Sequence, residues 1–168
     1  MSNSIDKYYN ERCNYNYYKK VTEILNSFTG TTSIIDIGAR RTPVFENLDK
    51  SIYKTCLDIE PIEKYSDNIN IITADFLRWT PDKEYDIVIC LQVLEHLENP
   101  KEFAQKLFLV GKIVIISLPY MWRKGRCKDH IQDPVDEELI KKWTDKEPTI
   151  SYIIEDKKLK RIICVYIP

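Results

Sequence analysis

The chain lacks the features that would assign it to a nucleic-acid-binding, membrane or disulfide-rich class. Its formal net charge is −1 over 168 residues, so it has no overall field to attract nucleic acid or a membrane surface. No apolar run approaches the roughly 18–20 residues that span a bilayer, and the polar N-terminus is unlike a signal peptide. None of the five cysteines forms a CxxC pair, which favours buried thiols in a reducing compartment. We therefore expect a folded cytoplasmic protein with no membrane span and no nucleic-acid partner.

Short apolar runs dominate what the sequence does contain. Five of them have the composition of strands that are buried on both faces, at 33–37, 52–57, 69–73, 86–90 and 112–118. Continuous apolar strands indicate a parallel sheet. Apolar residues at helical spacing predict helices over 14–28 and 100–110, with Asn99 as the N-cap of the second and Pro100 as its first residue. The alternation of strands and helices is typical of an α/β protein.

The last third of the chain follows a different pattern. Asp133-Pro134 predicts the start of another helix, which runs to about Trp143. Two further strands, at 150–155 and 160–167, are joined by a short polar turn and must therefore be antiparallel. The connections at 60–68 and 74–84 are short, so the crossover helices expected there are a turn or two at most, or absent.

The segment from Tyr85 to Pro100, YDIVICLQVLEHLENP, is the most informative in the chain. A buried strand leads into a short helix, the polar pair Glu95-His96 interrupts the apolar run, and an Asn-Pro helix start follows. This combination resembles the fourth-strand motif of the class I S-adenosylmethionine (SAM)-dependent methyltransferases. The resemblance implies a Rossmann-like three-layer α/β sandwich with SAM as cofactor, built on a mostly parallel seven-stranded sheet with a C-terminal antiparallel hairpin. We expect a single domain, 1–168, made of an N-terminal helical segment (1–30), a cofactor-binding core (31–118), and an acceptor loop, helix and hairpin (119–168).

Asp36 and Gly38 follow the first expected strand and resemble the first motif of this family, where a glycine lets the backbone approach the ligand closely. Many family members carry three glycines there, whereas this chain has Arg40 and Thr42 at the second and third positions. The missing glycines also disfavour a nicotinamide-dependent oxidoreductase, whose G-x-G-x-x-G fingerprint needs all of them. We expect Arg40 or Arg41 to pair with the cofactor carboxylate or with an anionic acceptor, the alternative being that both side chains face solvent.

The ends of the next three strands supply the other expected cofactor contacts. Asp58 lies about twenty residues beyond the glycine motif, the spacing at which an acid accepts hydrogen bonds from ribose hydroxyls, and Glu60 is the reserve candidate. The resemblance implies that Asp75 bonds the adenine amino group, that Phe76 packs on the ring, and that the end of the fourth strand faces the methionyl group. The alternative for each acid is an ordinary strand-end or turn-capping role. The full expected set is Asp36, Gly38, Arg40, Asp58, Ile59, Asp75, Phe76, Leu91 and Gln92.

The longest irregular segment, 117–134, follows the fifth strand at the expected ligand edge and is the candidate acceptor loop. Its cations and flat aromatic rings suit an anionic, ring-shaped acceptor such as a phosphorylated or carboxylated sugar. The expected acceptor contacts are Tyr120, Trp122, Arg123, Arg126 and His96. His130 is the candidate general base, the alternative for either histidine being a structural role. Cys127 and His130 are too few ligands for zinc, so no metal site is expected.

The leading functional hypothesis is a SAM-dependent methyltransferase that modifies an oxygen of a small molecule or an anionic sugar or glycan. The alternative is a catalytically silent methyltransferase-like module, which the altered glycine motif would favour. A nucleic-acid methyltransferase is disfavoured, because no Asn/Asp-Pro-Pro-Tyr-type base pocket follows the fourth strand. Since the short connections leave little chain to form a lid, we expect an acceptor site that is open to a large substrate or closed by a second copy in a homodimer.

Overall fold

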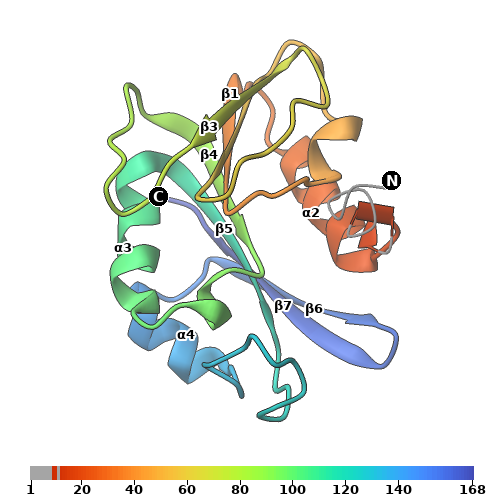
Figure 1. Ribbon diagram of the computed structural model, residues 1–168, viewed down its shortest axis with the longest axis vertical. Helices are drawn as coiled ribbons and strands as arrows, with labels where there is room; N and C mark the ends of the chain where they lie inside the picture. Colours follow the sequence, from red (N-terminus) through yellow and green to blue (C-terminus); the bar gives the residue numbers. More distant parts are fainter. Residues whose placement is uncertain (1–8, 11) are drawn as a thin grey trace.

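Seven strands form one mixed sheet in the computed structural model, which describes residues 9, 10 and 12–168 (Figure 1). The strands are β1 (Ser33–Ile37), β2 (Tyr53–Asp58), β3 (Ile69–Thr73), β4 (Tyr85–Leu91), β5 (Gly111–Pro119), β6 (Ile150–Asp156) and β7 (Leu159–Tyr166). Their order is β3-β2-β1-β4-β5-β7-β6. The first five are parallel to one another, and β7 is antiparallel to both β5 and β6. This arrangement confirms the predicted Rossmann-like sheet with its C-terminal hairpin.

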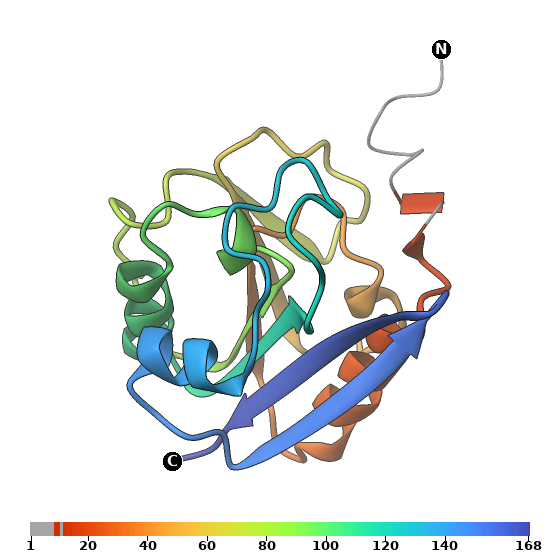
Figure 2. The same ribbon diagram turned by 90° about the horizontal axis from the view of Figure 1, so that it is seen from below.

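Helices cover both faces of the sheet (Figures 1 and 2). On one face lie α3 (Pro100–Val110) and α4 (Glu137–Thr144), and on the other lie α2 (Asn16–Ser27) and the short 3-10 helix η1 (Val44–Asn47). A second 3-10 helix, η2 (Leu94–His96), follows β4. No helix among the described residues is long and apolar enough to cross a membrane.

The core is divided between the two faces because successive strand residues point in opposite directions. In β4, Val88 and Cys90 pack with α3 and α4, whereas Ile87 and Ile89 pack with α2 and η1. All four side chains are fully buried. Both faces of the central strands are therefore dry, as the uninterrupted apolar runs predicted.

The two connections expected to be short contain no helix over 59–68 and 74–84, segments that lie entirely within the described residues. The sheet therefore has less cover beside β2 and β3 than beside β4 and β5. The helix predicted over 14–28 is present as α2. Part of the predicted N-terminal segment, residues 1–8 and 11, lies outside the described residues.

Two predicted helix starts differ from the structure. The helix predicted to begin at Asp133-Pro134 begins instead at Glu137, because the side chain of Asp136 accepts the N–H of Leu139 at 2.8 Å and so acts as the N-cap. Asp133 is directed toward His130 and does not cap a helix. Asn99 does precede α3, but its amide donates to Glu102 at 3.0 Å and makes no side-chain cap bond to the backbone.

The hairpin fixes the beginning of α2 through a long-range contact. Asp156 at the end of β6 accepts the N–H groups of Asn16 and Tyr17 at 2.6 and 3.2 Å. These donors lack intrahelical partners, so a carboxylate stabilises them both by hydrogen bonding and through the helix dipole. The turn that follows uses Lys157 and Lys158, both in the left-handed region at φ 50° and 66°, as tight antiparallel hairpins require.

A single carboxylate, Asp86, joins the starts of three parallel strands. Its oxygens accept the N–H of Thr32 at 2.8 Å, the N–H of Ser33 at 3.1 Å and the ammonium of Lys112 at 2.9 Å. The bond from Lys112, followed by those from Thr32, holds the pKa of Asp86 below its ordinary value. Ionised Asp86 therefore links β1, β4 and β5 at the edge opposite their carboxyl ends.

We predict that Asp86→Asn lowers the free energy of unfolding at pH 7 by about 1–3 kcal/mol, as expected when a charged acceptor of several hydrogen bonds is removed. Because the pKa of Asp86 is lower in the folded than in the unfolded state, ionised Asp86 stabilises the fold at pH values above the unfolded pKa of about 4. This stabilisation is lost as the pH falls through the folded-state pKa. Urea unfolding should therefore show the difference from wild type shrinking below about pH 4. Asp82→Asn, at an exposed residue before the same strand, is the control; an equal effect in both variants would contradict the role of Asp86.

Candidate functional site

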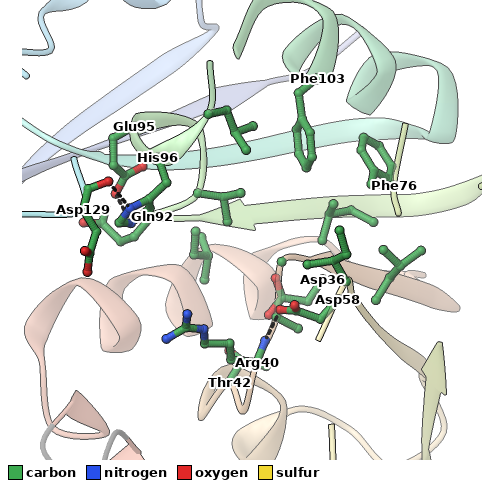
Figure 3. A pocket seen from close by; sticks show the side chains of 18 of the residues that line it. Asp36, Arg40, Thr42, Asp58, Phe76, Gln92, Glu95, His96, Phe103 and Asp129 are labelled. Carbon is green, nitrogen blue, oxygen red and sulfur yellow. Dashed lines mark hydrogen bonds and ion pairs between the residues drawn. The ribbon is translucent and has the colours of Figure 1, made fainter. Parts of the chain in front are cut away.

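A cavity of about 540 Å³ opens at the carboxyl ends of the parallel strands. In doubly wound sheets this edge is where ligands bind. The cavity is lined by the ends of β1 to β4, by η2, and by part of the loop between β5 and α4 (Figure 3). Twelve predicted site residues line it: Asp36, Gly38, Arg40, Asp58, Ile59, Asp75, Phe76, Leu91, Gln92, His96, Trp122 and His130.

The loop after β1 makes its turn with a single glycine. Gly38 has φ 75°, and its N–H donates to the carbonyl of Leu57 at 2.8 Å. Arg40 adopts the left-handed region at φ 42° and donates its N–H to Asp58 at 2.9 Å. The bond to Asp58 holds Arg40 in a conformation for which a second glycine would be the usual residue. The altered glycine motif therefore still brings the backbone of the loop against the cavity.

Two carboxyl groups lie behind this loop with different environments. Asp36 is buried, and burial raises its pKa well above the ordinary value, with the charge of Asp58 adding to the effect and a hydrogen bond from Thr42 opposing it. One oxygen of Asp36 has no hydrogen-bond partner among the described residues. Asp58 accepts the N–H groups of Arg40 and Glu60, both at 2.9 Å. These two bonds hold the carboxylate of Asp58 in one orientation. Each carboxylate oxygen has two lone pairs, so Asp58 can still accept hydrogen bonds from a ligand.

The end of β3 forms the apolar side of the cavity. Phe76 is buried and its ring lies 4.6 Å from that of Phe103 in α3. Asp75 accepts the N–H of Leu77 at 3.0 Å and lies 3.4 Å from the guanidinium of Arg78. Ile59, after β2, is 67% exposed. A flat apolar wall beside an acid is therefore present where the adenine contacts were expected.

Gln92 links three strands at the end of β4. Its backbone N–H donates to the carbonyl of Ser117 at 2.9 Å, and its side-chain amide donates to the hydroxyl of Ser117 at 3.1 Å. Its amide oxygen accepts from Arg161 of β7 at 3.2 Å. With Gln92 in the left-handed region at φ 58°, the chain turns sharply after Leu91, which also lines the cavity.

A cluster of carboxyl and imidazole groups lies at the opposite end of the cavity from Asp58 (Figure 3). An oxygen of Glu95 lies 3.9 Å from Nε2 of His96 and 4.0 Å from Nε2 of His130. Nδ1 of His130 lies 3.0 Å from Asp133, and Nδ1 of His96 lies 2.9 Å from the carbonyl of Asp129. The structure therefore brings together the two histidines of the chain, which are far apart in sequence.

Burial changes the ionisation of this cluster. Glu95 is completely buried, which raises its pKa to about 8; Asp133 adds to the shift and Arg161 opposes it. Burial lowers the pKa of His96, and the bond to Asp129 partly offsets this. Neutral imidazole is therefore favoured at His96 near neutral pH, with a lone pair on one ring nitrogen.

Backbone bonds fix the acceptor loop against η2. The carbonyl of Glu95 accepts the N–H groups of Ile131 and Gln132 at 3.0 and 3.3 Å. Trp122 stacks on His130 with ring centroids 5.5 Å apart, and its indole donates to the carbonyl of Lys160 at 2.6 Å. The position of His130 relative to Glu95 is thus set by main-chain bonds and by a stacked ring.

Three predicted acceptor residues lie outside the cavity lining: Tyr120, Arg123 and Arg126. Tyr120 donates its hydroxyl to Glu137 at 2.8 Å, and both arginines are exposed. The cavity is lined instead by Arg12, Arg40 and Arg161.

The sequence reasoning missed Glu95 as a site residue and took Asp133 for a helix cap. An acid within an apolar run was the available signal for Glu95. For Asp133, the histidine three residues earlier was the available signal.

We predict that Gly38→Ala destabilises the fold through two effects. A Cβ at this position would lie 2.5 Å from Cγ2 of Val93, and the residue would keep a left-handed φ of 75°. Gly30→Ala is the matched control, because Gly30 has φ 80° but no atom within 4 Å of the added Cβ. Urea unfolding should show a larger loss in Gly38→Ala than in Gly30→Ala, and Val93→Ala in the Gly38→Ala background should recover part of the difference. Equal losses in the two single variants would show that the contact with Val93 is unimportant.

Two of the solved structures that resemble this one are methyltransferases. The N-methyltransferase NodS from Bradyrhizobium japonicum WM9, in complex with S-adenosylhomocysteine, has a TM-score of 0.74 at 13% identity, covering 98% of this chain and 92% of that one. The 1,6-didemethyltoxoflavin-N1-methyltransferase of Burkholderia thailandensis, also with S-adenosylhomocysteine, has a TM-score of 0.71 at 14% identity, covering 96% and 83%. At such identities the likeness establishes the fold.

Sequence comparison establishes the family. The ubiquinone biosynthesis O-methyltransferase of Rickettsia bellii is 44% identical over 39 residues, which is 23% of this chain and 16% of that protein. The match thus spans about a sixth of the length of that relative. The family described as methyltransferase domain matches residues 9–153. This match covers most of the chain and confirms the predicted family: the chain belongs to the methyltransferase domain family and has the fold of the solved methyltransferases.

Proposed function

We propose that this methyltransferase transfers the methyl group to an oxygen of a small molecule or an anionic sugar or glycan. The observation that carries the proposal is the position of His130, whose ring is held by Asp133 and Trp122 inside the same cavity as the expected cofactor residues. Methyl transfer to a hydroxyl requires loss of its proton, and an oriented imidazole suits that requirement. The short match to an O-methyltransferase supports oxygen as the methylated atom.

The residues present fit the cofactor. Asp58 would accept the ribose hydroxyls, because both its oxygens keep free lone pairs and its orientation is fixed. Asp75 and Phe76 would hold the adenine, with Ile59 as a further apolar contact. Gly38, Leu91 and Gln92 would present backbone to the methionyl part, and Arg40 would pair with its carboxylate. When bound, SAM supplies a methyl group that is already activated, so the chain has chiefly to align the acceptor.

The arginines that line the cavity, alongside carboxyl groups that include Asp58 and Glu95, support an anionic acceptor. Arg12, Arg40 and Arg161 line it, and a guanidinium recognises carboxylate or phosphate through paired hydrogen bonds. Arg123 and Arg126 lie on the same loop as His130 but outside the cavity, so they would contact only an acceptor that extends beyond it. Tyr120 would do the same, whereas Trp122 and His96 lie within reach of the acceptor itself.

We predict that Asp58→Ala weakens SAM binding about ten- to a hundred-fold, because hydrogen bonds to a charged acceptor typically contribute about 1.5–3 kcal/mol. Isothermal titration calorimetry with SAM and S-adenosylhomocysteine measures the change. Glu60→Gln is the control, since Glu60 is exposed and does not line the cavity. Wild-type affinity for SAM in Asp58→Ala would show that this carboxylate does not bind the ribose.

We predict that His130→Ala lowers turnover by about 10²–10⁴-fold while SAM binding persists. Transfer of labelled methyl from SAM to a panel of phenols, catechols and sugar acids measures turnover, and calorimetry measures SAM binding. Lys128→Ala, an exposed change in the same loop, should leave both unchanged. Undiminished turnover in His130→Ala would show that the histidine only fastens the loop.

A further inference from the structure

We propose that Glu95, His96 and His130 bind a divalent transition-metal ion at the acceptor end of the cavity. Each offers one ligand atom, and these three atoms lie within 4.8 Å of one another. All three residues line the cavity, so an ion among them would face the acceptor. The sequence did not reveal this site, since it offered only the pair Cys127 and His130, whereas the fold adds Glu95 and His96 from η2.

The positions of the donor atoms suit one ion. An oxygen of Glu95 lies 3.9 Å from Nε2 of His96 and 4.0 Å from Nε2 of His130. The two rings meet edge to face, with centroids 4.8 Å apart and an interplanar angle of 86°. An ion at the centre of this triangle needs only small side-chain rotations to reach the metal–ligand distances of about 2.0–2.2 Å.

The partners of the two imidazoles direct the lone pairs toward the centre. Nδ1 of His96 lies 2.9 Å from the carbonyl of Asp129. A carbonyl only accepts, so Nδ1 must carry the proton and Nε2 carries the lone pair. Nδ1 of His130 makes the equivalent bond to the carboxylate of Asp133 at 3.0 Å. Metal-binding histidines are typically oriented in this way by a carbonyl or carboxylate behind the ring.

The carboxyl group of Glu95 lacks the partners that a buried acid normally has. It is completely buried, and neither oxygen has a hydrogen-bond partner in another described residue. Arg161 is the cation that acts on it, and Asp133 adds a second negative charge nearby. A buried carboxylate is costly unless it is paired or binds a metal, and a divalent ion would supply the missing charge.

The donor set indicates which ions would bind. Imidazole nitrogen favours zinc, cobalt, iron, nickel or copper over magnesium and calcium. Three protein ligands leave coordination positions open, which is typical of catalytic rather than structural sites. Cys127 also lines the cavity but is not part of the group, so we expect its thiol to be dispensable.

This inference rests on the proposed O-methylation and assigns a way to activate the hydroxyl. An acceptor whose hydroxyl adjoins a second oxygen, such as a catechol or a sugar acid, would bind the ion through both oxygens. Coordination lowers the pKa of the hydroxyl, so its proton passes to solvent. The oxygen then forms the new O–CH₃ bond as the S–CH₃ bond breaks, which releases S-adenosylhomocysteine. His130 holds the ion and so assists loss of the hydroxyl proton through it, which keeps the position of His130 central to the proposed O-methylation.

The test is metal binding by the full chain without an affinity tag. After chelation and dialysis, the protein is titrated with Zn²⁺ in calorimetry and with Co²⁺ under visible absorption. We expect one ion per chain and the intense visible bands of low-coordinate cobalt. The variants Glu95→Gln, His96→Ala and His130→Ala should each weaken binding by more than about 100-fold, and Asp133→Asn by about 10- to 100-fold, as for other groups behind metal ligands. Cys127→Ser, the matched control in the same loop, should bind as wild type does.

Thermal unfolding and SAM titration of every variant establish that each is folded. The proposal is overturned if folded wild type binds no ion stoichiometrically, if all three ligand variants still bind, or if Cys127→Ser alone abolishes binding. If the ion binds in the expected pattern but no hydroxyl is methylated, the metal site stands and the proposed O-methylation fails. If hydroxyl methylation proceeds equally in chelator and with Zn²⁺, the proposed function stands and the metal site has no part in it.

Discussion

Burial of both faces of the parallel strands is the constraint on which the cavity depends. The side chains of β1 are buried throughout, and those of β4 nearly so. Backbone polar groups in such strands must bond to neighbouring strands, which fixes the register and brings the carboxyl ends of β1, β2, β3 and β4 to one edge. Polar residues at the ends of these strands, including Asp58 and Gln92, gather at this edge, where the apolar packing of the sheet ends. The apolar pattern thus stops at this edge, and the polar side chains that can contact a ligand begin there.

The loop between β5 and α4 completes this edge through main-chain bonds. Ile131 and Gln132 donate to the carbonyl of Glu95, so the loop and η2 are held as one unit. The carbonyl is bound while the carboxyl group of the same residue has no partner in another described residue. The position of the acid is therefore well determined, although its burial is unfavourable. Such a combination is typical of sites where stability is given up for function.

The missing glycines and crossover helices alter the edge of the sheet less than the sequence implied. Gly38 alone makes the close turn after β1, because the bond from the N–H of Arg40 to Asp58 holds Arg40 in the left-handed region. The helix-free connections before β3 and β4 still bring Asp75 and Phe76 to the cavity, since pairing of β3 with β2 sets where β3 ends and Phe76 packs on Phe103 of α3. The sheet therefore tolerates short connections around the residues that line the cavity.

The sequence by itself determined the layers of the fold, and it predicted most of the residues that line the cavity beside Asp58. Apolar runs identified the central strands because a strand buried on both faces must be apolar throughout, and a short polar turn identified the C-terminal hairpin. The order of strand-end acids indicated where a ligand would lie. Helix-capping residues were less informative where two of them lie close together in the sequence. The N-cap of α4 is Asp136, although Asp133-Pro134 was predicted to begin the helix. Only the tertiary structure decided that Tyr120, Arg123 and Arg126 lie outside the cavity. It alone also decided that Glu95, His96 and His130 meet within the cavity, with Asp133 behind the ring of His130. No periodicity encodes such a meeting, because it depends on how a long irregular loop folds back, through backbone bonds, onto a helix more than thirty residues earlier.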